Sequence, residues 1–185
     1  MEKGFKIQRI GFVIYLLTMI VLALYTLSFM TDYQNLFGYL LKQNESITRF
    51  YEHMQAFNQI IFWLAIVSVL SIIVMFVLEL RTRICDRFAL GVMSCFGALN
   101  IGTAIYGFIS IPKLVTEYKG VDFSKMWLED TALTEDSVYT MRFTSFNLGY
   151  AVFAILLIVT IFFMATLWIN HIKFKRNEGL GYEKV

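Results

Sequence analysis

Four long stretches without Asp, Glu, Lys or Arg constrain the fold of this chain more than any other feature. They cover residues 10–31, 53–78, 88–112 and 143–172. A helix that crosses the ~30 Å hydrocarbon core of a bilayer needs about 20 apolar residues, because each residue adds ~1.5 Å. Each stretch is therefore long enough for one crossing. The expected transmembrane helices cover about 10–30, 59–80, 88–111 and 146–169.

The composition agrees with a membrane location. Hydrophobic residues make up 58% of the 185 residues, and the mean hydropathy is +0.63, values outside those of ordinary soluble domains. The stretches are apolar on all sides, whereas strands of a membrane barrel alternate in polarity. We predict an all-α integral membrane protein, a four-transmembrane-helix bundle that forms one multi-pass domain over residues 1–185, most simply in the plasma (cytoplasmic) membrane.

The basic residues predict the orientation of the helices. Cytoplasmic loops of membrane proteins carry an excess of Lys and Arg, and short loops are the most informative. Ten of the 16 basic residues fall on one face of the predicted topology: Lys3, Lys6, Arg9, Arg81, Arg83, Arg87, Lys173, Lys175, Arg176 and Lys184. Both termini, including the tail 170–185, are therefore expected in the cytoplasm. Arg81, Arg83, Arg87, Lys173, Lys175 and Arg176 are expected to contact anionic lipid.

Two outer segments, about 31–58 and 112–145, are predicted to form a helical extracytoplasmic cap. Apolar residues in the first outer segment and the start of the second span recur at helical spacing: Ile47, Phe50, Tyr51, Met54, Phe57 and Ile61. A matching stripe, Tyr33, Leu36, Phe37, Leu40 and Leu41, precedes the turn at Asn44. The two stripes favour a helical hairpin; the alternative is that one or both lie flat in the headgroup region.

The second outer segment contains too many large apolar side chains for a disordered linker, and we expect it to fold over the bundle. Aromatic residues are enriched at protein interfaces. Five of them form the predicted partner surface of the cap: Phe50, Tyr51, Phe123, Trp127 and Tyr139.

The third span is rich in small residues, which allow membrane helices to approach closely. At 100° per residue they divide into two stripes. One stripe contains Gly97, Asn100, Ala104 and Gly107, and the other contains Gly91, Cys95, Ala98 and Gly102. We therefore expect this helix to be packed on both sides.

Asn100 is a polar residue in the middle of this apolar helix. Polar and small residues expected near it, for helix packing or an intramembrane polar site, are Thr18, Ser68, Ser71, Gly97, Gly107 and Thr160. Two interpretations remain open. Asn100 joins helices through hydrogen bonds, or it belongs to a binding site for a small ligand or lipid headgroup, or to a water path.

Catalytic and metal-binding patterns are absent from the sequence. The two histidines, His53 and His171, fall near opposite membrane surfaces, and no HExxH, CxxC, GxSxG or phosphate-loop motif occurs. Cys85 and Cys95 are about 15 Å apart on one helix, beyond disulfide reach. We expect neither catalytic residues nor a metal or cofactor, and no nucleic-acid partner, because the basic residues are few and lie at the membrane surface.

These features predict a noncatalytic membrane subunit that associates with another membrane protein or with copies of itself in the bilayer. Its role would be accessory, scaffolding or regulatory. The alternative is a transport component: an oligomeric pore, or a transporter subunit that binds a small molecule or lipid. Ionisable residues inside the spans, which carriers commonly use, are scarce here, and this favours the first prediction.

Overall fold

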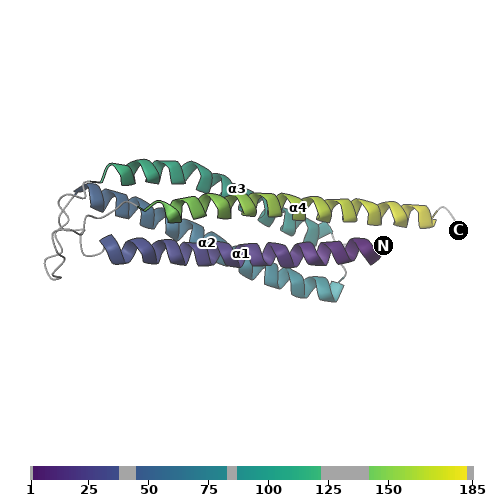
Figure 1. Ribbon diagram of the computed structural model, residues 1–185. Helices are drawn as coiled ribbons and strands as arrows, with labels where there is room; N and C mark the ends of the chain where they lie inside the picture. The colour runs from purple at the N-terminus through teal and green to yellow at the C-terminus, as the bar shows by residue number, and fades with distance from the viewer. Residues whose placement is uncertain (1, 38–44, 83–86, 122–141, 183–185) are drawn as a thin grey trace.

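The computed structural model describes residues 2–37, 45–82, 87–121 and 142–182, which form four helices in chain order (Figure 1). The helices are α1 (Glu2–Phe37), α2 (Glu45–Thr82), α3 (Arg87–Lys119) and α4 (Thr144–Tyr182). Several predicted features lie outside the described residues: Arg83, Cys85, the turn at Asn44, and the aromatic residues Phe123, Trp127 and Tyr139.

All four helices are long and apolar enough to cross a membrane, which confirms the prediction of four such helices. The apolar stretches within them are Ile7–Phe29, Glu45–Val74, Arg87–Lys119 and Thr144–Arg176. Helices suit the hydrocarbon region because every backbone N–H and C=O in them is bonded within the segment. The chain therefore has the architecture of an integral multi-pass membrane protein.

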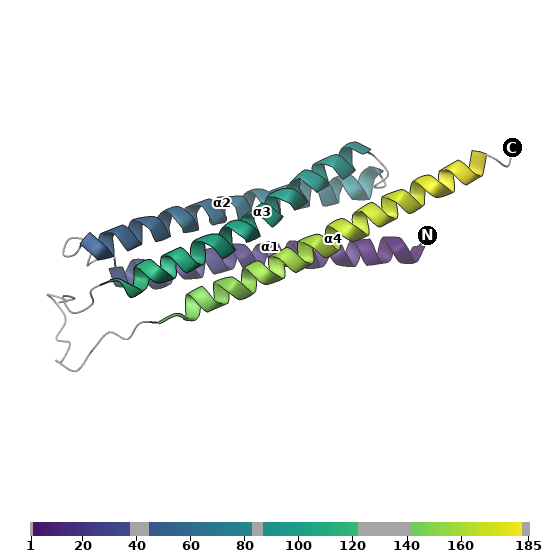
Figure 2. The ribbon, with the colours of Figure 1, turned by 90° about the horizontal axis from the view of Figure 1, so that it is seen from above.

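The helices pack as a four-membered ring. Helix α1 contacts α2 and α4, and α3 contacts the same two helices, so α1 and α3 lie diagonally opposite each other. Helices α1 and α4 run antiparallel, and both chain termini lie at one end of the bundle (Figures 1 and 2). We call this end the termini end.

The helices extend beyond the predicted spans. Helix α3 continues past Pro112 to Lys119, and α4 continues to Tyr182. Proline removes one backbone donor, and α3 nevertheless continues through Pro112, whose side chain is exposed. At its end, the Gly120 amide donates to the Glu117 carbonyl at 3.0 Å. The length of an apolar run predicts the part of a helix that lies in hydrocarbon. The same helix can continue for further turns outside it.

Aromatic side chains fill the half of the bundle away from the termini end. Phe29 makes edge contacts with Phe57 and Phe146, with ring centroids 6.1 and 5.5 Å apart. Phe57 also stacks on Tyr106 at 5.8 Å. These rings come from all four helices and together form one continuous core.

The first predicted apolar stripe belongs to this core. All six of its residues, from Ile47 to Ile61, are buried. This corrects the prediction that Phe50 and Tyr51 offer a partner surface: Phe50 packs against Tyr118 at 5.2 Å between centroids, and Tyr51 is also buried. Their helical spacing is that of a buried face, and in the structure both residues pack inside the bundle.

Candidate functional site

Four polar side chains, one from each helix, meet in the middle of the bundle: Tyr15, Ser68, Asn100 and Thr160. The Ser68 hydroxyl donates to the Asn100 side-chain carbonyl at 2.8 Å. The Asn100 amide donates to the Tyr15 hydroxyl. Thr160 Oγ1 lies beside the Tyr15 hydroxyl without completing a hydrogen bond of good geometry. We call these four residues the polar cluster.

The polar cluster links the two diagonal helices, α1 and α3, whose backbones do not come close to each other. The bond between Asn100 on α3 and Tyr15 on α1 spans the diagonal of the ring, while the bond from Ser68 joins neighbouring α2 to α3. An interhelical hydrogen bond in a membrane contributes about 0.6 kcal/mol on average. Such bonds select one rotational setting of the four helices, with apolar packing still dominating their association.

The structure brings together three of the predicted polar residues: Ser68, Asn100 and Thr160. Thr18 and Ser71 are not part of the cluster, because their hydroxyls donate to the carbonyls of Ile14 and Val67 in the preceding turn of their own helices. These bonds satisfy a hydroxyl locally. Position along a helix predicts how deep a residue lies in the membrane, but it does not determine which way the side chain turns.

Sequence reasoning missed Tyr15, which is the acceptor for Asn100. A tyrosine near the end of a span is usually part of the interfacial aromatic belt. The available signal was that Tyr15 lies inside the predicted span, where a buried hydroxyl requires a partner.

A second polar contact, at the termini end, was also missed. The Asn170 amide donates to the Gln8 side-chain carbonyl at 3.0 Å, joining α4 to α1, and Gln8 is buried. Polar side chains therefore join helices in the middle of the bundle and again near its termini end.

Glycine residues on the inner face of α3 allow α4 to pack closely against it. A Cβ atom placed on Gly107 would lie 2.6 Å from the Phe153 ring, and one placed on Gly97 would collide with the Met164 side chain. Real Cβ atoms do not approach so closely. A side chain at Gly107 would have to displace the buried Phe153 ring, whereas one at Gly97 would have to displace the more flexible Met164 side chain.

The outer face of α3 is different. Gly91, Cys95, Ala98 and Gly102 are all exposed, and a Cβ placed on Gly91 or Gly102 would meet no atom within 4 Å. The expectation that α3 is packed on both sides is therefore wrong for a single chain. A ring of four helices gives α3 two neighbours, and its outer face points away from both.

On the other helices, large side chains cover the exposed face. On α1 this face carries Leu17, Val21 and Leu24, each close to half exposed, and such side chains are ordinary lipid-facing residues. The outer face of α3 lacks them over three helical turns, between Phe88 and Ile105. We call the residues Gly91, Cys95, Ala98 and Gly102 the small-residue face.

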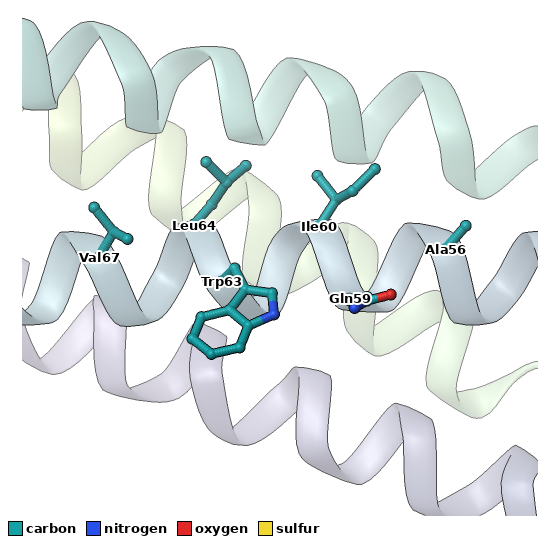
Figure 3. Close-up of a pocket in the computed structure, with 6 residues that line it drawn as sticks. All are labelled: Ala56, Gln59, Ile60, Trp63, Leu64 and Val67. Atoms are coloured by element: carbon teal, nitrogen blue, oxygen red, sulfur yellow. The ribbon is translucent and has the colours of Figure 1, made fainter.

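A shallow surface hollow lies on α2, lined by Ala56, Gln59, Ile60, Trp63, Leu64 and Val67 (Figure 3). All of these residues belong to one helix, so the hollow has a single wall and does not enclose a ligand. Trp63 extends outward from it and is 58% exposed.

The basic residues predicted to contact lipid lie at the termini end where they are described. Arg87, Lys173, Lys175 and Arg176 are exposed; Arg81 lies near the end of α2, and its side chain is outside the described set. Within the described residues, no group of three or more His, Cys, Asp or Glu side chains has an arrangement that fits a metal ion.

Comparison of the chain with protein-family models, curated protein sequences and solved structures finds no match.

Proposed function

We propose that this chain is a noncatalytic membrane subunit that acts by binding another membrane protein, or further copies of itself, through the small-residue face of α3. The observation that carries the proposal is the exposure of Gly91, Cys95, Ala98 and Gly102 on one side of a membrane helix. An accessory, scaffolding or regulatory role follows from binding of this kind.

The physical basis is the way helices associate in lipid. Lipid tails already satisfy apolar side chains, so helices gain little from hiding them and associate through close van der Waals contact. Small residues spaced four and seven apart permit such contact. The inner face of α3 illustrates it in this chain, since Gly97 and Gly107 hold α4 in this way.

The proposal includes the topology in which both termini are cytoplasmic and the opposite end of the bundle forms an extracytoplasmic cap. The excess of basic residues at the termini end supports this orientation. The extension of α2 and α3 beyond their predicted spans, with Phe50 packed against Tyr118, supports a helical cap.

Purification in a mild detergent, followed by mass spectrometry of co-eluting proteins, tests the proposal. We expect the wild-type chain to elute with stoichiometric foreign subunits or as a homo-oligomer. The variant Gly91→Leu/Gly102→Leu should elute alone with unchanged helicity, because leucine blocks the small-residue face at positions where an added Cβ atom has no neighbour within 4 Å.

Ala165→Leu is the matched control. Ala165 is a small exposed residue on α4, next to Met164, which packs on Gly97, so it lies at the depth of the small-residue face. This variant should keep the wild-type elution. A monomeric wild-type chain, or equal loss of partners in both variants, would contradict the proposal.

A transport component is the second candidate, and it has its own supporting observation. The side-chain oxygens of Asn58 and Thr160 are buried and have no hydrogen-bond partner among the residues that the structure describes. An unsatisfied buried polar atom costs about 1–3 kcal/mol, which water or a polar solute in a path through the bundle would offset. A purified homo-oligomer that contains a bound small molecule, and loses it in Asn100→Leu at an unchanged thermal midpoint, would favour this candidate.

A further inference from the structure

The two ends of the bundle differ in how their charges are arranged. At the end opposite the termini, charged groups pair within the chain: Arg49 with Glu45 at 3.1 Å, and His53 with Glu117 at 2.9 Å. Lys119 lies over the Phe143 ring at 5.8 Å. Some charges of both signs at this end therefore have partners within the chain, and Glu52, Lys113 and Arg142 are exposed there as well.

At the termini end, the sequence also has the acidic residues Glu2, Glu79, Asp86, Glu178 and Glu183, whose side chains lie outside the described set. The exposed charged side chains that the structure does describe at this end are basic. They come from three helices: Arg9 on α1, Arg87 on α3, and Lys173, Lys175 and Arg176 on α4. None of the five forms an ion pair within the described part of the chain. The bond between Gln8 and Asn170 places the α1 and α4 groups at a common level. We call these five residues the basic rim.

Each part of the basic rim adjoins a large exposed apolar side chain. Ile10 follows Arg9 and is 60% exposed, Phe88 follows Arg87 and is 75% exposed, and Ile172 precedes Lys173 and is 60% exposed. The positive charges thus sit directly beside the apolar surface of the bundle. A ligand that fits this arrangement carries negative charge at one end and a hydrocarbon chain at the other.

We infer that the basic rim binds the phosphate headgroups of anionic phospholipids in the leaflet at the termini end, with their acyl chains against Ile10, Phe88 and Ile172. Charge complementarity selects the phosphate, and the adjoining apolar side chains select an amphiphile over a soluble anion or an acidic protein. Helix α4 continues past the other helices at this end (Figure 2), and this keeps Lys173, Lys175 and Arg176 accessible. The inference is independent of what binds α3.

Native mass spectrometry of the purified full-length chain, with added dioleoylphosphatidylglycerol or dioleoylphosphatidylcholine, tests the inference. The wild type should retain the anionic lipid preferentially. In Lys173→Gln/Lys175→Gln/Arg176→Gln, affinity for phosphatidylglycerol should fall by about 100-fold, since each basic group near an anionic surface contributes about fivefold. Retention of phosphatidylcholine should not change.

The matched control removes the same charge from the opposite end, in Lys113→Gln/Lys119→Gln/Arg142→Gln, and should retain the lipid like the wild type. If the triple variant loses helicity, Lys173→Gln alone replaces it, with an expected loss of about fivefold. Equal retention of both lipids by the wild type, or an equal loss in the control, would overturn the inference. Displacement of the lipid by millimolar glycerol 3-phosphate would overturn it too, because the site would then recognise a soluble anion.

Discussion

The two faces of α3 are built from the same kinds of residue and have opposite surroundings. On the inner face, Gly97 and Gly107 lie against Met164 and Phe153 of α4, with no room for a Cβ atom. On the outer face, Gly91 and Gly102 have no neighbouring atom within 4 Å of a Cβ position. Glycine inside a helix costs about 1 kcal/mol relative to alanine. The inner contact offsets this cost within the chain, whereas the outer face has no such contact in one chain.

This difference separates folding from association. Residues of the inner face determine how the four helices of one chain pack, and we propose that residues of the outer face determine what the folded chain binds. Substitutions on the two faces should therefore affect different measurements, which makes the comparison testable with one helix.

The largest expected effect is that of Gly107→Leu. The new side chain would overlap the Phe153 ring, so α3 and α4 must separate or Phe153 must leave the aromatic core. Overpacking of a tight core typically costs 1–3 kcal/mol or more, and here the obstacle is a buried ring. We expect a loss of about 3 kcal/mol, measured by denaturant titration of helicity in detergent micelles. A folding stability equal to that of the wild type would contradict the claim that the inner face of α3 is tightly packed against α4.

A smaller loss is expected for Asn100→Leu, which removes the amide that joins α3 to both Tyr15 and Ser68. The single Ser68 hydroxyl proton can then be donated to the Leu64 carbonyl, whose oxygen is 2.8 Å away, so the loss should be about 1–2 kcal/mol for two interhelical bonds. Membrane insertion should not change. The same denaturant titration measures it, and a loss as large as that of Gly107→Leu would show that polar contacts dominate over packing.

Tyr15→Phe should have a smaller effect still. It removes the hydroxyl acceptor of Asn100 but keeps the ring, which stacks on Phe163 at 4.8 Å between centroids. We expect a loss of about 0.6 kcal/mol, the average for one interhelical bond. In a double-mutant cycle with Asn100→Leu, the two losses should not add; full additivity would mean that the two side chains act independently.

Gly102→Leu should leave folding stability unchanged or raise it by up to about 1 kcal/mol, because it replaces glycine in a helix at a position where an added Cβ atom has no neighbour within 4 Å. It is the direct counterpart of Gly107→Leu on the same helix. Destabilisation comparable to the inner substitution, in the isolated chain, would show that the outer face has an intramolecular partner.

The sequence was sufficient for the architecture and for part of the site. Apolar run length predicted four spans, because the thickness of the bilayer leaves few alternatives. Angular spacing separated the two faces of α3 correctly. It could not tell which face is inside, since both contain glycines, and the decision depends on Met164 and Phe153 of a distant helix. Tyr15 and Gln8 were missed for a similar reason: their polar partners, Asn100 and Asn170, lie far away in the chain.

The most direct test of the central claim is the accessibility of the native Cys95 thiol in the membrane of the natural host. In a Cys85→Ser background, the rate of alkylation of Cys95 by a lipid-soluble maleimide is compared with that of a thiol at Ala165 in Cys95→Ala/Ala165→Cys. Both positions are exposed in the isolated chain and lie at similar depth. If a partner covers the small-residue face, Cys95 should react at least several-fold more slowly than the Ala165 position. Equal rates in the native membrane would contradict the account.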